Sequence, residues 1–208
     1  LASNENSLGP SPQAVEAIER AAWSMHLYPD GGTWELRNKL AEHHGLSADQ
    51  IIPGNGSNEI LELIGHCFCR PGANVVFSAH AFIVYKLVSA LFGSESREVP
   101  MADGLVHDLD AMAAAIDENT SVVFLCNPNN PTGTSCGVDA IRAFIEKIPA
   151  DTLVVLDEAY AEISPAELPP SVDWLEAFPN LLICRTFSKG YGLAGMRIGY
   201  GLGSPDLI

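Results

Sequence analysis

Short runs of apolar, often β-branched residues alternate in this chain with stretches that have the 3.6-residue periodicity of helices. The apolar runs lie at residues 75–77, 122–125, 153–156 and 181–183, and helical stretches include 60–68, 82–92 and 140–148. Continuous apolar runs of this length are typical of strands buried on both faces, and their alternation with helices is typical of parallel sheets. We therefore predict an α/β fold with a mainly parallel sheet and helices on both faces.

Two further helices are predicted before this alternation begins. Ser11 followed by Pro12 provides an N-cap and a proline at the first helical position, and apolar residues then recur at helical spacing. A turn-forming segment at residues 28–32 follows, and Thr33 is expected to cap a second helix that carries Leu36 and Leu40 on one face.

Composition excludes several classes of protein. Hydrophobic residues make up 47% of the 208 residues against 18% charged, which is typical of a compact domain and not of a disordered chain. The net charge of −15, with 11 Lys and Arg, opposes binding to nucleic acid. No apolar run approaches the length of a membrane span, and the first residues do not resemble a signal peptide. We expect a cytoplasmic protein.

Cysteine and histidine do not follow a metal-binding pattern. Cys67 and Cys69 are separated by one residue, which matches no usual zinc spacing, and the five cysteines are expected to be reduced and mostly buried. His43 and His44 stand near the end of a helical stretch, where we expect a solvated helix face. No metal site is predicted.

Polar segments follow the apolar runs, where ligand sites of open parallel sheets form. These segments are GNGSNE (54–59), NPNNPTG (127–133), DEAY (157–160) and RTFSK (185–189). Because the carboxyl ends of parallel strands meet at one edge, all four are expected to converge there. The first of them opens a helix and offers free N–H groups and the helix dipole to an anion, although an ordinary strand-to-helix turn has the same sequence features.

Asp157 and Lys189 are the strongest candidates for chemistry. A carboxylate after a buried strand needs a positive partner, such as a protonated pyridine nitrogen, or else caps a helix. Of the four lysines, Lys189 alone follows a strand, inside a Ser-Lys-Gly turn. A partly buried lysine near positive charge loses its proton readily and can form a Schiff base.

Four other residues have both a ligand-binding and a structural interpretation. Arg197 could pair with a phosphate through two N–H groups, or form a structural salt bridge. Asn130 and Tyr160 could each donate a hydrogen bond to a phenolate-like oxygen, although an Asn in such a loop is also common turn chemistry. Phe82 could stack on an aromatic ring, or belong to the core.

Together, NPNNPTG, DEAY and RTFSKGYGLAGMRIGY, in this order and spacing, resemble the class I/II aminotransferases among the fold type I pyridoxal-phosphate enzymes. Within that group, the segments SNENSLGPSP, YPDGGTWELR, GNGSNE, AHAFIVY and CNPNNPTGT most resemble the histidinol-phosphate aminotransferases. The resemblance covers nearly the whole chain. It implies the large domain of that fold, with a seven-stranded sheet, and an enzyme that transaminates L-histidinol phosphate with 2-oxoglutarate in histidine biosynthesis.

The resemblance also implies roles for single residues around pyridoxal 5'-phosphate. Lys189 would hold the cofactor covalently and shuttle the proton, and Asp157 would pair with the pyridinium. The remaining cofactor-binding residues implied are Asn130 and Tyr160 on the ring oxygen, Phe82 stacked on the ring, and Ser57, Asn58, Ser188 and Arg197 on the phosphate.

A homodimer is implied as well, because in this family the tyrosine that matches Tyr28 reaches the cofactor phosphate of the neighbouring subunit. Residues 1–30 would then be an N-terminal arm and helix of the small-domain and dimer region, and residues 31–208 the cofactor-binding large domain. Relatives continue past this point into a smaller C-terminal domain that holds the substrate, so the chain is expected to be truncated at its C-terminus.

Other activities fit the same motifs. An aromatic amino acid aminotransferase and a threonine-phosphate decarboxylase are the nearest enzyme alternatives. A non-enzyme alternative is the aminotransferase-like cofactor-binding module of a transcription regulator, but such proteins carry a basic DNA-binding extension and this chain is strongly acidic.

Overall fold

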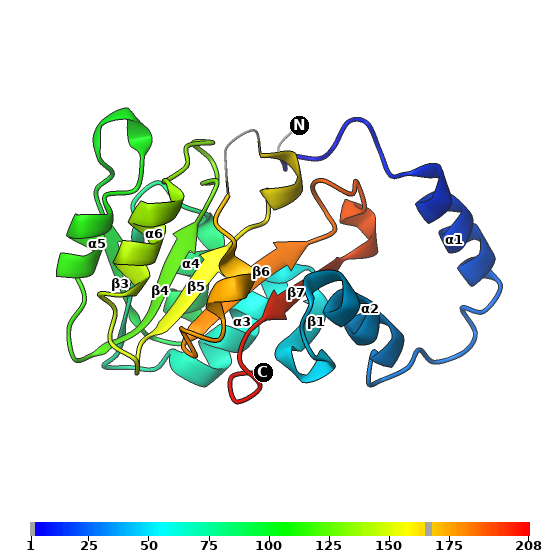
Figure 1. The fold of residues 1–208 in the computed structure, drawn as a ribbon, viewed down its shortest axis with the longest axis horizontal. Coiled ribbons are helices and arrows are strands. Elements are labelled where there is room, and N and C mark those ends of the chain that lie inside the picture. The colour runs from blue at the N-terminus through cyan, green and yellow to red at the C-terminus, as the bar shows by residue number, and fades with distance from the viewer. Residues whose placement is uncertain (1–2, 165–167) are drawn as a thin grey trace.

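The computed structural model describes residues 3–164 and 168–208 as one α/β unit (Figure 1). The helices are α1 (Pro12–Ala22), α2 (Trp34–His44), α3 (Ser57–Phe68), α4 (Ile83–Leu91), α5 (Leu109–Ala114) and α6 (Val138–Ile145). The strands are β1 (Ile51–Asn55), β2 (Asn74–Ser78), β3 (Glu95–Val99), β4 (Thr120–Cys126), β5 (Leu153–Asp157), β6 (Leu181–Thr186) and β7 (Ile198–Leu202). Five short 3₁₀ helices, among them η4 (Ser171–Trp174) and η5 (Ala194–Met196), lie in the connections of the described residues.

The strands form one seven-stranded sheet in the order β1-β7-β6-β5-β4-β2-β3. From β3 to β6 every neighbouring pair is parallel. Strand β7 runs antiparallel to both β6 and β1, so it alone points the other way. The predicted mainly parallel α/β sheet is confirmed.

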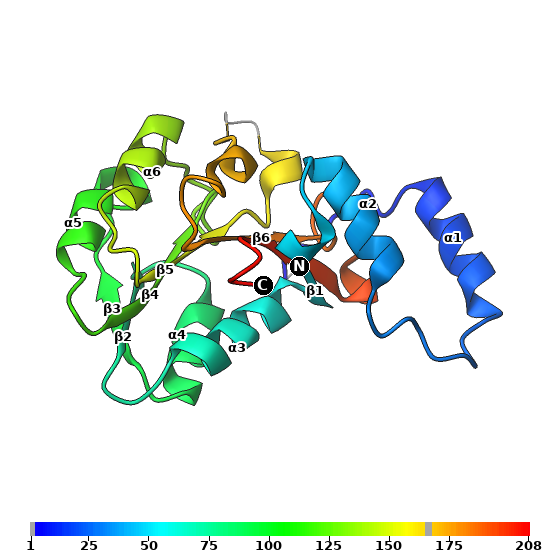
Figure 2. The same cartoon turned by 60° about the horizontal axis from the view of Figure 1, so that its bottom comes forward.

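Helices cover both faces of the sheet, as predicted (Figure 2). Along β4, Val122 and Phe124 pack with residues of α3 and α4, whereas Val123 and Leu125 pack with residues of α2, α5 and α6. Successive side chains of a strand point to opposite faces, so a strand that is apolar at every position supplies both cores at once. The continuous apolar run of β4 is explained by this double burial.

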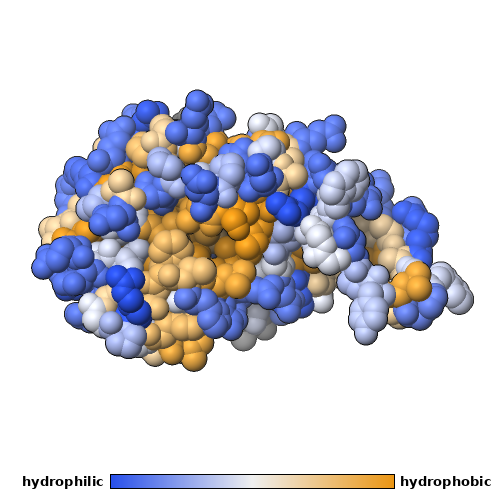
Figure 3. All heavy atoms as spheres, turned by 90° about the horizontal axis from the view of Figure 1, so that it is seen from below, coloured by the Kyte–Doolittle hydropathy of each residue, from blue (hydrophilic) through white to orange (hydrophobic). Residues whose placement is uncertain are grey.

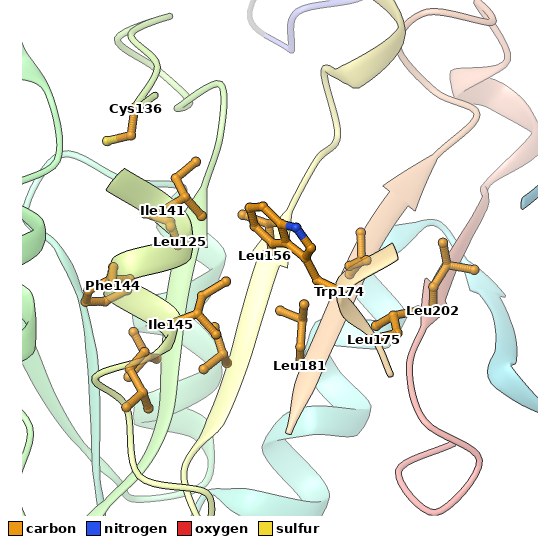
Figure 4. Packing of buried hydrophobic residues seen from close by; sticks show 14 of the residues in the cluster. Leu125, Cys136, Ile141, Phe144, Ile145, Leu156, Trp174, Leu175, Leu181 and Leu202 are labelled. Carbon is orange, nitrogen blue, oxygen red and sulfur yellow. The ribbon is translucent and has the colours of Figure 1, made fainter. Parts of the chain in front are cut away.

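The core that contains Val123 and Leu125 is closed by a segment outside the regular helices. Trp174 of η4 packs in the same cluster as Leu156 of β5 and Leu181 of β6 (Figure 4). Phe144 and Ile145 of α6 complete this layer and are almost fully buried.

Helix α1 stands apart from the sheet and buries none of its residues (Figures 1 and 2). Its N-cap is the predicted Ser11, whose hydroxyl accepts a hydrogen bond from the backbone of Ala14. The proposed division of the chain at residue 30 stays a prediction, and residues 1–2 of the N-terminal part lie outside the described residues.

Seen from below, hydrophobic residues gather across the middle of the molecule's surface (Figure 3).

The capping role predicted for Thr33 is wrong in its chemistry. Thr33 occupies the N-cap position of α2, but its side chain makes no capping hydrogen bond and its backbone is left-handed, with φ of 48°. Asp30 caps instead, because its carboxylate accepts hydrogen bonds from the backbone N–H groups of Gly32 and Trp34. These two bonds lower the pKa of Asp30.

Candidate active site

A cavity of about 1050 Å³ lies at the edge of the sheet where β1, β4, β5 and β6 end. It is lined by nine of the predicted site residues: Ser57, Asn58, Phe82, Asn130, Asp157, Tyr160, Ser188, Lys189 and Arg197. Strand β7 begins at the same edge because it is antiparallel, so the β6–β7 connection brings both Lys189 and Arg197 to the cavity. The four polar segments converge here, and the roles of their residues stay predictions.

Asp157, the last residue of β5, is a buried carboxylate that lines the cavity and is only 2% exposed. Its Oδ2 accepts a hydrogen bond of 2.7 Å from the hydroxyl of Tyr85, and its Oδ1 accepts one from the backbone of Ala159. Burial raises the pKa of Asp157, and the two hydrogen bonds and the charge of Lys189 oppose that rise. A cation in the cavity would therefore favour the ionised carboxylate.

Lys189 is positioned by the turn that follows β6 and by the N-terminal arm. Its Nζ donates hydrogen bonds to the carbonyl groups of Ser3 and Asn4, at 2.8 and 3.3 Å, and lies 5.7 Å from the centre of the Tyr160 ring. Partial burial lowers the pKa of Lys189. Arg197 lowers it further, against the opposing charges of Glu5 and Asp157. A lysine in this position loses its proton more readily than a solvated one, as nucleophilic attack on an aldehyde requires.

The N-terminus of α3 and Arg197 form a site that suits a phosphate. The N-cap is Gly56, which provides no side-chain cap, so the first N–H groups of the helix remain available to an anion. The φ of Gly56 is 78°, which favours glycine, and a Cβ there would lie 2.5 Å from Nη2 of Arg197 and displace the guanidinium. Ser188 shares this region, with its hydroxyl 3.4 Å from Nη1 of Arg197.

Tyr160, Asn130 and Phe82 lie on other walls of the cavity. The hydroxyl of Tyr160 accepts a hydrogen bond of 3.0 Å from Asn4, and burial raises the pKa of Tyr160, so its hydroxyl stays protonated and able to donate. Phe82 is the N-cap residue of α4, and its ring meets that of Tyr85 edge-on, with 5.8 Å between the ring centres.

Tyr28 lies outside the cavity that the other nine predicted site residues line. Its side chain is fully exposed, in the segment between α1 and α2, and it does not line the cavity. Trp23, Met25 and Leu27 in the same segment are also largely exposed. Within one chain the structure therefore gives Tyr28 no role at the site, and its predicted role across a dimer interface stays a prediction.

Sequence reasoning missed several residues that shape the site. Asn4 contacts Tyr160 and Lys189, and Asn6 donates hydrogen bonds to the carbonyl groups of Lys189 and Gly190. No local sequence pattern shows that the segment containing Asn4 and Asn6 contacts the turn after β6. Tyr85 was also missed, although it stands one helical turn after Phe82 and so shares its face.

A second buried carboxylate, Glu158, directly follows Asp157 but does not line the cavity. It is 0% exposed, and its Oε2 accepts hydrogen bonds of 3.0 and 2.7 Å from Nε and Nη2 of Arg185. Ser171 donates to its other oxygen at 2.6 Å. This network joins the residue that follows β5 to β6 and η4.

His44 corrects the expectation that both adjacent histidines are solvated. His43 is exposed, but His44 is half-buried and its Nε2 lies 3.0 Å from the hydroxyl of Tyr200. Burial, with the charge of Arg185 adding to it, lowers the pKa of His44 to about 4.

In residues 3–164 and 168–208, no three His, Cys, Asp or Glu side chains are grouped so that they could hold a metal ion. Nor does any helix of that part of the chain combine the length and the apolar character needed to cross a bilayer.

Known proteins similar to this chain share its sequence, its fold or both. "Histidinol-phosphate aminotransferase 2" of Nitrosospira multiformis is 53% identical over 208 residues, all of this chain and 53% of the relative, and that of Pseudomonas aeruginosa is 53% identical over 205 residues. The crystal structure of histidinol-phosphate aminotransferase from Sinorhizobium meliloti in complex with pyridoxal-5'-phosphate has a TM-score of 0.93 at 39% identity, and covers 98% of this chain and 55% of that one.

The chain spans about half the length of the curated relatives that it matches. The sequence profile described as "Aminotransferase class I and II" matches residues 1–208. The four polar segments lie within the matched residues, and all four line the same cavity. The chain therefore belongs to the class I and II aminotransferase family.

Proposed function

We propose that this chain is the cofactor-binding part of a pyridoxal-phosphate-dependent transaminase that acts on L-histidinol phosphate and 2-oxoglutarate. The observation that carries the proposal is the single cavity that joins a lysine of lowered pKa, a buried carboxylate and an open helix N-terminus beside an arginine. The substrate assignment is supported by the relatives, which are named histidinol-phosphate aminotransferases.

The residues present fit pyridoxal phosphate. When bound, this cofactor supplies an electron sink that makes the α-proton of an amino acid acidic. Asp157 would pair with its ring nitrogen, and the buried, uncompensated carboxylate is suited to a cationic partner. Ser57, Asn58, Ser188 and Arg197 would hold the phosphate through the start of α3 and a guanidinium.

The other side chains would orient the ring and move protons. Asn130 and Tyr160 would donate hydrogen bonds to the ring oxygen, and Phe82 would cover one face of the ring. Nζ of Lys189 would attach to the aldehyde carbon and, once released by the incoming amine, would take the α-proton and return it to the neighbouring carbon. Its lowered pKa favours the neutral amine that both steps require.

The attachment site is tested by reducing the full-length protein with borohydride in the presence of pyridoxal phosphate and mapping the labelled peptide. We expect an absorbance band at the edge of the visible range and a pyridoxyl group on Lys189. Lys189→Ala should lose both, whereas Lys39→Ala, which changes an exposed helix lysine paired with Glu35, should keep them. A label distributed over several lysines would refute the assignment.

The substrate is tested separately, with cofactor-loaded protein and 2-oxoglutarate. L-histidinol phosphate should be transaminated with a much higher kcat/KM than phenylalanine, tyrosine or O-phosphothreonine. Preference for an aromatic amino acid, or release of carbon dioxide from O-phosphothreonine, would replace the substrate assignment without affecting the cofactor assignment.

We further propose that the protein is a homodimer in the cytoplasm, with Tyr28 reaching the cofactor phosphate of the neighbouring subunit. The exposed apolar side chains of Trp23, Met25 and Leu27 beside Tyr28 support an interface there. Mixing Tyr28→Ala with Lys189→Ala protein tests this arrangement. If Tyr28 acts across subunits, mixed dimers regain one complete site and activity returns; a mixture without gain would mean that Tyr28 does not act in this way.

A further inference from the structure

Behind the cavity wall, Tyr85 contacts the carboxylate that is expected to pair with the cofactor ring. The Tyr85 hydroxyl donates to Oδ2 of Asp157 at 2.7 Å, and Tyr85 is 0% exposed. The other oxygen of Asp157 is held by the backbone N–H of Ala159 at 3.1 Å. Both oxygens of this buried group therefore have a donor, one from a side chain and one from the backbone.

The remaining neighbours of Asp157 provide little compensation for its charge. In the sheet it stands between Cys126 of β4 and Cys184 of β6, two buried thiols whose pKa values are raised by burial, so both stay neutral. Lys189 acts on Asp157 through its charge at longer range. Within the described residues Asp157 forms no ion pair, so the Tyr85 hydroxyl is its only side-chain donor there.

The Tyr85 ring is fixed by aromatic packing on three sides. It stacks on Phe124 of β4, with ring centres 4.5 Å apart and planes 5° from parallel. Phe82 and Phe77 meet it edge-on, with centres 5.8 and 6.2 Å away. A ring held in this way offers its hydroxyl in one place, because few rotamers remain. The hydroxyl also keeps its proton, since burial and the nearby Asp157 raise the pKa of Tyr85 well above the usual value.

We propose that Tyr85 is a positioning residue whose hydroxyl holds Asp157 in one orientation and favours its ionised form, so that the carboxylate is ready to pair with a cationic ring in the cavity. The last part of this statement rests on the proposed function. Phe82 and Tyr85 then serve one ligand from one helical turn: Phe82 lines the cavity and Tyr85 acts through Asp157. A hydrogen bond to a buried charged group contributes more than one between neutral groups.

Tyr85→Phe separates this role from simple packing, because it keeps the aromatic stack and removes only the hydroxyl. In cofactor-free protein, the pKa of Asp157 should shift upward, since the Tyr85 hydrogen bond now lowers it. Carboxyl infrared bands or ¹³C resonances report this pKa, and Asp157→Asn identifies the signal. Fluorotyrosine at position 85 has a more acidic hydroxyl and should shift the pKa of Asp157 downward, which gives a second variant if Tyr85→Phe folds poorly.

The cofactor-loaded protein gives an independent spectroscopic measurement. With Asp157 harder to ionise, the ring nitrogen carries less positive charge, and the attached nitrogen of Lys189 becomes easier to protonate. The pH midpoint of the cofactor's absorbance change should therefore rise in Tyr85→Phe, and kcat should fall about tenfold, the equivalent of one lost hydrogen bond to a charged group.

Tyr200→Phe is the matched control. Tyr200 is equally a buried tyrosine, 2% exposed, but its hydroxyl contacts His44 on the opposite face of the sheet. It should lower stability and leave both the pKa of Asp157 and the absorbance midpoint unchanged. The proposal is overturned if Tyr85→Phe behaves like this control. If wild-type protein takes up no pyridoxal phosphate, the proposed function fails, and the cofactor-free pKa measurement still decides whether Tyr85 controls Asp157.

Discussion

At the scale of single residues, the candidate site depends on buried polar groups that satisfy one another. Asp157, at the end of β5, pairs with Tyr85, and the next residue, Glu158, pairs with Arg185 and Ser171; the two carboxylates face opposite cores. The place of Asp157 after an apolar run predicts it as a site residue. Tyr85 and Arg185 cannot be predicted as partners from the sequence, because a pairing between residues far apart in sequence is set by the sheet order and not by any local pattern.

The Glu158–Arg185 pair should be far more important for stability than its surface counterparts. Glu158→Gln leaves the largely buried Arg185 guanidinium without a counter-charge, and removal of one partner of a buried pair costs about 3–5 kcal/mol. Glu35→Gln breaks an exposed i,i+4 pair with Lys39 and should cost at most about 0.5 kcal/mol. Urea unfolding of both variants measures the difference. Equal, small losses would show that Arg185 finds another partner or water.

His44 should make the folded state sensitive to mild acid. Its pKa is about 4 in the folded protein and about 6.5 in an unfolded chain, so the unfolded state binds the extra proton between these values. The contribution of neutral His44 is therefore complete above about pH 6.5 and is lost as the pH falls toward about 4.

We expect His44→Gln to lose less unfolding free energy than wild type between about pH 7 and about pH 5. His26→Gln, at an exposed histidine in the segment between α1 and α2, is the control. Differences between variants are compared because burial raises the pKa values of Asp157 and Glu158, and a raised carboxyl pKa stabilises the folded state as the pH falls, which opposes the effect of His44. Parallel curves for all three proteins would contradict the assignment to His44.

At the scale of elements, sequence reasoning found the buried strands β2, β4, β5 and β6 and missed the sheet edge strand β3 and the antiparallel strand β7. Residues 95–99 read ESREV, which has no apolar run because an edge strand is largely exposed. Residues 198–202 read IGYGL, and its glycines lower strand propensity. The helices of the alternating region were predicted to within a few residues, except the six-residue α5, which is too short to show a period.

The close packing of β7 against the start of α3 explains one of these glycines. A Cβ on Gly199 would lie 2.2 Å from the backbone N of Ser57, so no side chain fits without moving the helix N-terminus. Gly199→Ala should therefore reduce the unfolding free energy by about 1–3 kcal/mol and weaken binding of pyridoxal phosphate. Gly31→Ala adds a Cβ that meets nothing within 4 Å and serves as the control. Unchanged cofactor affinity in Gly199→Ala would show that the α3 terminus is not part of the binding site.

At the scale of the whole molecule, one sheet is shared by two hydrophobic cores. Phe144 belongs to the core beneath α2, α5 and α6, and Ile60 to the core beneath α3 and α4. Each core uses alternate residues of the same strands, so neither can separate from the sheet without exposing the other. We expect the unit to unfold as a whole.

Phe144→Ala should cost about 3–5 kcal/mol and Ile60→Ala about 2–5 kcal/mol, whereas Leu8→Ala, at a side chain 93% exposed, should change stability by less than about 0.5 kcal/mol. In both core variants, fluorescence of the buried Trp174 and far-ultraviolet circular dichroism should report the same urea midpoint. Midpoints that separate in either variant would show that the two cores unfold independently.

The position of β7 between β6 and β1 also sets an order of events during synthesis. Ile51 pairs with Leu202, so β1 has no strand to join until residues 198–202 have been synthesised. The parallel strands from β2 to β6 can associate earlier, whereas β1 and the start of α3 remain outside the sheet until β7 is present. Of the groups proposed to hold a phosphate, Ser57 and Asn58 are thus synthesised early, whereas Ser188 and Arg197 lie in the connection that precedes β7 and are synthesised late, so a nascent chain that stalls before them would present most of the sheet without the complete site.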